Sequence, residues 1–265
     1  MTLPEPIREF WYGACALGER SRRTQWGVVV TDSRYPRVWD ANNAAVMEGS
    51  PGLTMEEIRS VLIPAIGESG ATHEHIEFWE TSVESPAIRE MRHTGERPDP
   101  DVAMLFEGPP ALAFGMARDP GVAVEELTRL DATFWRWYRD SLKEFRMELA
   151  DDLLDQMVDR VQRVFLPHMR FFVGYVDGEM AGYTSLLSLA GVGYLDNVVT
   201  MPEFRRRGIA SATVTRSVQE SLASDARAVF LLAEQNGAPQ RLYERLGFRV
   251  RANIDSFTRP LQRAN

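Results

Sequence analysis

The sequence predicts an α/β (α+β) protein with two domains, one over residues 1–118 and one over residues 119–265. Three observations lead to this prediction. A chain of 265 residues is longer than an average compact domain. Segments with helical and strand periodicity alternate along the first half. The turn cluster Arg118-Asp119-Pro120-Gly121 then precedes a second half in which three strand-like segments follow one another.

The N-terminal half reads as alternating helices and strands. Ile7, Phe10 and Ala14 recur at helical spacing, so an amphipathic helix is expected at the start of the chain. Thr54 is a good N-cap residue with acidic residues after it, and it predicts the start of another helix. The expected elements are a helix over 5–19, strands over 26–30 and 37–47, a helix over 54–67, a strand over 75–79, a helix over 85–91 and a strand over 102–106.

The C-terminal half contains an expected antiparallel meander. Asp177-Gly178 joins its first two strands and is a strong hairpin signal. The expected elements are a strand over 122–127, helices over 132–145 and 150–165, strands over 170–176, 179–187 and 192–200, a helix over 208–222, a strand over 228–232, a helix over 238–246 and a strand pair after Phe248. The order helix, strand, helix, strand is common to 54–106 and 208–257, so the two halves are expected to be distant repeats.

Composition narrows the classes of partner. The net charge of -8 speaks against nucleic acid as the main ligand and slightly favours a cationic one. The sequence lacks a long apolar run and a signal-like N-terminus, so we expect a cytoplasmic protein without a membrane partner. Cys15 is the single cysteine. His73 and His75 share one face of a strand, but their spacing reveals no third ligand, so they are expected to be ordinary surface residues and no metal is expected.

The segment from Asp196 to Ser211 predicts an anion-binding site. A strand ends there, a loop with three consecutive arginines follows, and a helix begins at Gly208. The free N–H groups and the positive dipole end of a helix favour phosphate, and glycine permits close approach to the backbone. Taken in isolation, a basic triplet is more often a solvated loop.

Two motifs resemble those of the GNAT acetyltransferases. The pattern Arg205-x-x-Gly208-x-Ala210 is similar to the family's Arg/Gln-x-x-Gly-x-Gly/Ala signature. The segment from Asn236 through Tyr243 to Gly247-Phe248 is similar to a second family motif, with Ala238 one position early. The resemblance covers roughly residues 119–260. It implies the GNAT fold, a mixed and mostly antiparallel sheet flanked by helices, preceded here by a smaller α/β domain that is expected to be a degenerate GNAT-like repeat.

The resemblance also implies a site for acetyl-CoA as cosubstrate. Main-chain groups at the end of the fourth strand of the domain would pair with the pantetheine arm, and a splay between this strand and the next would open the slot. Backbone amides of the arginine loop and the helix start would hold the pyrophosphate, and Asn236 would contact the amides of the cofactor. The implied cofactor-binding residues are Val198, Val199, Thr200, Arg205, Arg206, Arg207, Gly208, Ile209, Ala210, Ser211, Asn236 and Tyr243.

For catalysis, the resemblance implies that Tyr243 donates a proton to the departing thiolate. The alternative is a core aromatic residue on an amphipathic helix. Asp196 is the candidate base for the amine, against a purely structural carboxylate or the use of bulk water. On a regular strand Asn197 would point away from it. The aromatic run 134–138 is interpreted either as a wall of the acceptor pocket or as core packing.

The predicted activity is N-acetylation of a primary amine, on a small molecule or a protein, by direct attack in a ternary complex. The alternative is a non-catalytic acetyl-CoA sensor. In the N-terminal half the corresponding loop, 47–53, carries an acidic residue and no arginine. This half is therefore expected to bind no acetyl-CoA. It would cover the acceptor side, mediate homodimer formation, or serve only as a scaffold.

Overall fold

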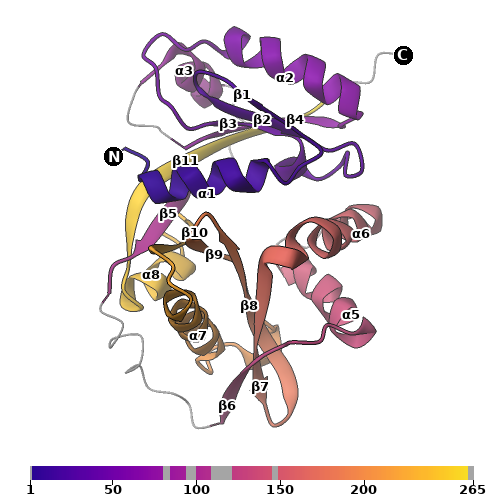
Figure 1. Cartoon of the computed structure of the whole chain (residues 1–265), viewed down its shortest axis with the longest axis vertical. Coiled ribbons are helices and arrows are strands. Elements are labelled where there is room, and N and C mark those ends of the chain that lie inside the picture. The colour runs from indigo at the N-terminus through magenta and orange to yellow at the C-terminus, as the bar shows by residue number, and fades with distance from the viewer. Residues whose placement is uncertain (1, 80–83, 94–99, 109–120, 145–148, 262–265) are drawn as a thin grey trace. The chain divides into compact units, whose positions relative to one another are not determined.

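The computed structural model describes residues 2–79, 84–93, 100–108, 121–144 and 149–261 (Figure 1). The chain forms two compact units. Unit 1 contains Met1–Ala103, Ala233–Gln235 and Val250–Asn265, and unit 2 contains Met104–Leu232 and Asn236–Arg249. The chain therefore returns to unit 1 with its last strand after it has built unit 2. The predicted domain boundary between residues 118 and 119 lies outside the described residues.

Unit 1 has a sheet of strand order β1-β2-β3-β4-β11. Strands β3 and β4 are parallel, and the other neighbours in this order are antiparallel. Strand β5 begins in unit 1 and ends in unit 2, and β11 begins in unit 2 and ends in unit 1. The elements are α1 (Glu5–Cys15), β1 (Arg20–Arg23), β2 (Gly27–Thr31), η1 (Trp39–Ala41), β3 (Asn43–Val46), α2 (Met55–Ser69), β4 (His73–Phe78), α3 (Pro86–His93), β5 (Asp101–Phe106) and β11 (Phe248–Pro260).

Two predictions for these elements were wrong, and one strand was missed. The strand expected over 37–47 is confined to β3, because the short 3-10 helix η1 precedes it. The strand pair expected after Phe248 is the single 13-residue strand β11. Strand β1 was not predicted, since its four residues are all exposed and carry no alternating apolar pattern.

Helix α2 begins where the sequence predicts. Thr54 accepts a hydrogen bond from the Glu57 N–H, and the Glu57 carboxylate accepts one from the Thr54 N–H. This capping box satisfies main-chain donors at the helix start with the chain's own side chains. The helix ends at Gly70, which adopts the left-handed conformation with φ 72°.

The two faces of the unit 1 sheet differ in character. One face packs against α2 and α3, and Ile58, Ile76 and Phe257 belong to this apolar core. Side chains alternate along a strand, so His73, His75 and Glu77 of β4 share the opposite face. His73 and His75 are both only 4% exposed. The prediction that these two histidines lie on an ordinary surface was therefore wrong, because the sequence could not show what covers that face.

Unit 2 has a sheet of strand order β10-β9-β8-β7-β6. Strands β7 to β9 form the expected antiparallel meander, β6 pairs antiparallel with β7, and β10 pairs with β9 in parallel. The mixed, mostly antiparallel sheet that was predicted is confirmed. The elements are β6 (Val122–Glu126), α5 (Ala132–Ser141), η2 (Leu142–Glu144), α6 (Asp151–Arg160), a π-helical turn η3 (Val161–Phe165), η4 (Leu166–His168), β7 (Met169–Val176), β8 (Glu179–Leu189), β9 (Val192–Thr200), η5 (Pro202–Phe204), α7 (Ile209–Ala223), β10 (Ala228–Glu234) and α8 (Ala238–Arg245).

Helices cover both faces of the unit 2 sheet (Figure 1). Helix α7 contacts β7, β8 and β9, and the Thr184 hydroxyl donates to Thr213 of that helix at 2.9 Å. Helix α5 packs aromatic rings against the other side, with Phe134 and Phe171 at 5.1 Å between ring centroids. Unit 1 contains the parallel crossover β3–α2–β4, and unit 2 contains the parallel crossover β9–α7–β10. The two crossovers follow the order expected for repeats. Within the described ranges, every helix is too short or too polar to cross a bilayer.

Candidate active site

The end of β9 pairs on one edge only. On the β8 side, Val198 is opposite Thr184 and Val199 is opposite Tyr183. On the other side, the register between β9 and β10 ends at the pair Leu195 and Leu231. The two parallel strands thus diverge where the sequence predicts a splay. An extended ligand can pair with the main chain of 198–200 at this edge.

A β-bulge lies at the point of divergence. The register of β8 and β9 shifts so that Asp196 and Asn197 together oppose Ser185, whose hydroxyl accepts the Asn197 N–H at 3.0 Å. The Asn197 side-chain amide donates to the Asp196 carboxylate at 2.7 Å. The two side chains therefore meet. The expectation that Asn197 points away was wrong, because it assumed the alternation of a regular strand.

The start of α7 is shaped to receive an anion. Gly208 is its N-cap and adopts φ 80°, and Arg206 two residues earlier adopts φ 64°. The N-cap residue has no side chain to bond the first-turn amides, and the first turn contains no acidic residue. The amide groups at the helix start and the positive end of its dipole are thus directed at the loop of arginines.

These features line one cavity of about 760 Å³. Such a volume suits a ligand larger than a single phosphate and lies within the usual range for small-molecule sites. Ten of the residues predicted from the sequence line it, and Asp196, Arg207 and Asn236 lie outside the lining. The lining residues are Val198, Val199, Thr200, Arg205, Arg206, Gly208, Ile209, Ala210, Ser211, Ala238, Pro239, Leu242, Tyr243 and Arg245.

Four lining residues on α8 were not predicted. Ala238, Pro239 and Leu242 follow the helical spacing that puts residues three or four apart on one face, the face that also carries Tyr243. Arg245 adds a third guanidinium to the cavity. Helical spacing along α8, taken from Tyr243, is the sequence signal that could have predicted these residues.

Tyr243 is buried in the wall of the cavity. Its side chain is 6% exposed, and its ring meets Phe248 edge-on at 6.1 Å between centroids. Burial raises the pKa of the Tyr243 hydroxyl above its usual value of 10. The phenol is therefore protonated at neutral pH and has a proton to donate. The core-aromatic interpretation and the acid interpretation are compatible, since the same residue packs on Phe248 and lines the cavity.

Asp196 lies beside a buried aromatic group rather than in the cavity wall. Burial is the main cause that raises the pKa of Tyr138 and Tyr183, and the charge of Asp196 adds to it. Ser141 donates to the Tyr183 hydroxyl oxygen at 3.3 Å. Of the aromatic run, Phe134 and Tyr138 are core residues, as one of the two interpretations held. Trp137 is half-buried and packs on Tyr183 at 5.5 Å.

Sequence comparison identifies the family of this segment. Residues 129–248 match the model of the acetyltransferase (GNAT) family. The matched segment contains the cavity, so the cavity lies in the part of the chain that is similar to an acetyltransferase domain. No curated protein matches the sequence.

Solved structures share the fold at low identity. The chain is similar to a GCN5-related N-acetyltransferase from Kribbella flavida, with a TM-score of 0.70, 14% identity, and coverage of 99% of this chain and 97% of that one. A conserved protein of unknown function from Staphylococcus epidermidis gives a TM-score of 0.71 and 13% identity, covering 92% and 94% of the two chains. A tandem GNAT protein from the clavulanic acid biosynthesis pathway gives 0.57 and 15%, covering 100% and 98%. The fold likeness thus extends over the N-terminal half.

Proposed function

We propose that the protein transfers an acetyl group from acetyl-CoA to a primary amine by direct attack in a ternary complex. The observation that carries the proposal is the single cavity shared by the diverging end of β9, the uncapped start of α7 and Tyr243. An extended pantetheine arm requires a free strand edge, a pyrophosphate requires free main-chain donors, and a departing thiolate requires a proton donor.

The cofactor would lie along the cavity. The main chain of Val198, Val199 and Thr200 would pair with the pantetheine amides. Amides of residues 206–211 would bind the pyrophosphate, with Arg205 and Arg206 adding charge-assisted hydrogen bonds. Arg245 is a further candidate for the phosphates. Asn236 and Arg207 lie outside the lining, and their contacts with acetyl-CoA remain predictions.

In the reaction, the neutral amine nitrogen would attack the thioester carbonyl carbon. A backbone N–H near Val198 or Val199 would stabilise the oxyanion. As the C–S bond breaks, Tyr243 would protonate the sulfur, and the proton lost by the amine would pass to Asp196 through water or to bulk water. Because Asp196 lies outside the cavity lining, the proton of the amine would reach it through a bridging water molecule.

Unit 1 is proposed to bind no acetyl-CoA. Its helix α2 corresponds in order to α7, but the Thr54 and Glu57 side chains already bond the donors at its start. Two acidic residues in its first turn also oppose an anion there. Unit 1 would instead cover the acceptor side or mediate a homodimer, with a passive scaffold as the plain alternative.

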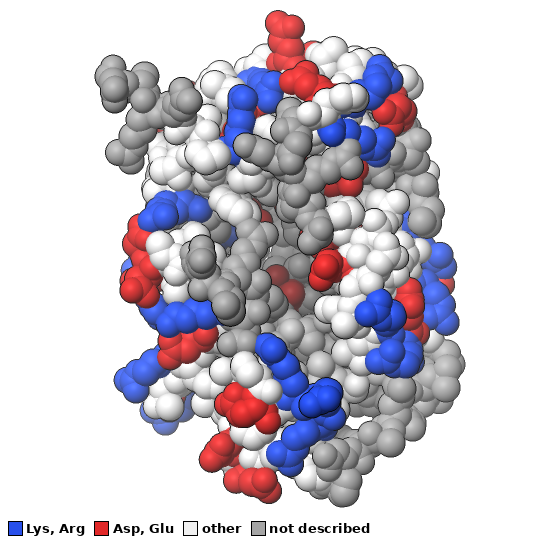
Figure 2. Space-filling view, turned by 180° about the vertical axis from the view of Figure 1, so that it is seen from behind, with Lys and Arg blue, Asp and Glu red and all other residues white. Residues whose placement is uncertain are grey.

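The acceptor is proposed to be a primary amine on a small molecule or a protein, without a nucleic acid or membrane partner. Figure 2 shows acidic and basic side chains interspersed on the face that it draws. The net charge of -8 is therefore not gathered there into one field that would select a cationic substrate. A non-catalytic acetyl-CoA sensor is the second candidate, and the presence of Tyr243 in the wall favours the enzyme.

Calorimetric titration with acetyl-CoA is expected to give one site per chain. The expectation follows from the contrast between the uncapped α7 and the capped α2. Two sites would contradict the assignment of unit 1. The absence of binding at high micromolar cofactor would overturn the proposed function.

Gly208→Ala is expected to weaken acetyl-CoA binding at least about tenfold, a loss of about 1.4 kcal/mol. The protein itself has space for the added methyl group, but the group would stand where the pyrophosphate approaches the main chain. Gly178→Ala is the matched control, because Gly178 adopts φ 83° with equally open surroundings in a hairpin turn. Both variants pay about 1–2 kcal/mol of backbone strain. Equal losses of affinity would show that strain alone is responsible.

A further inference from the structure

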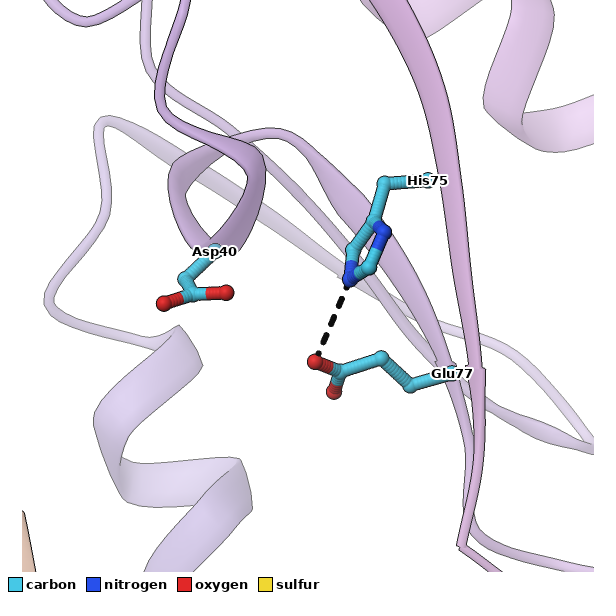
Figure 3. Close-up of side chains that lie close together, drawn as sticks. All are labelled: Asp40, His75 and Glu77. Carbon is cyan, nitrogen blue, oxygen red and sulfur yellow. Dashed lines mark hydrogen bonds and ion pairs between the residues drawn. The ribbon is translucent and has the colours of Figure 1, made fainter. Parts of the chain in front are cut away.

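A group of polar side chains in unit 1 takes no part in the proposed reaction. His75 and Glu77 project from the same face of β4, and Asp40 approaches them from η1 (Figure 3). One ligand-type atom from each of the three residues lies within 4.8 Å of the other two. Spacing along the sequence did not reveal this group, because Asp40 is 35 positions before His75.

The contact between His75 and Glu77 is long for an ion pair. His75 Nε2 lies 3.3 Å from Glu77 Oε1, whereas charge-assisted N–H···O bonds are usually about 2.7–2.9 Å. Two ligands of a tetrahedral metal ion with bonds of about 2.0–2.1 Å are about 3.3 Å apart, by the geometry of a tetrahedron. The observed separation therefore fits two ligands of one ion as well as it fits a long hydrogen bond.

Each of these two side chains has a second partner that holds it in place. His75 Nδ1 lies 2.6 Å from Thr258 Oγ1, which leaves Nε2 facing Glu77. The indole N–H of Trp79 donates to Glu77 Oε2 at 2.9 Å, so that Oε1 faces His75. Metal-ligating histidines and carboxylates are commonly oriented by such outer partners.

Further polar atoms on this face are buried without a partner. Asn43 is 2% exposed, and its side-chain carbonyl oxygen makes no hydrogen bond. The pairing of Ala45 with Glu77 places Asn43, two residues earlier on β3, on the same face of the sheet. Neither ring nitrogen of the buried His73 makes a hydrogen bond of ordinary geometry. Buried polar atoms of this kind are usually matched by an ordered water molecule or an ion.

We propose that Asp40, His75 and Glu77 bind a divalent transition-metal ion in unit 1. The donor set of one imidazole and two carboxylates suits Zn²⁺ and related ions better than Mg²⁺ or Ca²⁺, which prefer oxygen ligands alone. Asp40 is exposed, so its carboxylate can move the short distance that closes the site. The site shares no residue with the proposed acetyl-CoA cavity, because its residues all belong to unit 1 and the cavity residues to unit 2.

The test is calorimetric titration of Zn²⁺ into the full-length protein, freed of metal by a chelator and carrying no histidine tag. One ion per chain is expected for the wild type, together with a rise in melting temperature. Asp40→Asn is expected to weaken Zn²⁺ binding about 10- to 100-fold, by analogy with the effect of disturbing a metal shell. This variant changes an exposed side chain and should leave the fold intact.

His93→Gln is the matched control for His75→Gln, since His93 is an exposed imidazole on α3 outside the group. His93→Gln should bind Zn²⁺ like the wild type, and His75→Gln should lose binding. The proposal is overturned if the wild type binds no stoichiometric Zn²⁺, or if Asp40→Asn binds as tightly as the wild type. A loss with His93→Gln equal to that with His75→Gln would overturn it too.

Discussion

Tyr243→Phe is expected to lower kcat for acetyl transfer about 100- to 10,000-fold, the usual contribution of a general acid. The dissociation constant for acetyl-CoA should stay within about threefold of the wild-type value, since the ring and its contact with Phe248 remain. Because burial raises the pKa of Tyr243, its proton is present through mildly alkaline pH. Steady-state kinetics with a screened amine acceptor, alongside calorimetry, measures both quantities.

Tyr194→Phe is the matched control for this substitution. Tyr194 also belongs to unit 2, is 8% exposed against 6% for Tyr243, and stacks on Phe230 at 4.8 Å between ring centroids. It lies outside the cavity lining, so its variant should keep the wild-type kcat. If both variants lose activity to the same extent, the loss reflects lower stability of the protein and not proton donation by Tyr243. If the wild type binds acetyl-CoA but acetylates none of the amines, the sensor becomes the better reading.

Glu74→Gln is expected to destabilise unit 1 by about 3 kcal/mol, at the lower end for breaking a buried ion pair. The Glu74 side chain is 0% exposed and accepts from two guanidiniums, Arg59 of α2 at 2.7 Å and Arg259 of β11. It thereby ties the last strand and a core helix to β4. The two arginines retain 24% and 44% exposure and can rehydrate, which limits the loss.

Glu90→Gln is the control for that experiment, because Glu90 pairs with the same Arg59 at 2.8 Å but is 50% exposed. Surface pairs contribute about 0–1 kcal/mol, so this variant should unfold like the wild type. Urea unfolding followed by tryptophan fluorescence reports on unit 1, which contains Trp11, Trp26, Trp39 and Trp79 of the six tryptophans. A change below about 0.5 kcal/mol for Glu74→Gln would show that the buried pair adds nothing net.

Much of the site could be predicted because its signals are local. A glycine at a helix start, arginines before it and a tyrosine on the next helix lie within short stretches of sequence, and the geometry of each stretch follows from a few residues. Gly208 and Tyr243 accordingly line the same cavity. Arg245 was not predicted, because it occupies an unspecified position of the motif that contains Tyr243.

The elements of the fold were also predictable where their signals are local in the sequence. The capping box at Thr54 and the Asp177-Gly178 hairpin depend on neighbours in the chain, and both elements appear where expected. The course of β11 was not predictable. Its pairing of Phe257 with Ile76 joins residues 181 positions apart, and no local pattern encodes the choice of a strand partner.

The sequence by itself determined the type and order of most elements, the glycine at the α7 start with the arginines before it, and the resemblance that links the C-terminal half to its family. Only the tertiary structure decided where β9 and β10 diverge, that a bulge brings Asn197 onto Asp196, and that Asp40 meets His75. Helix starts and turns are set by interactions over a few residues. Register, bulges and clusters of side chains are set by pairing between distant segments, whose energies depend on the whole packed sheet.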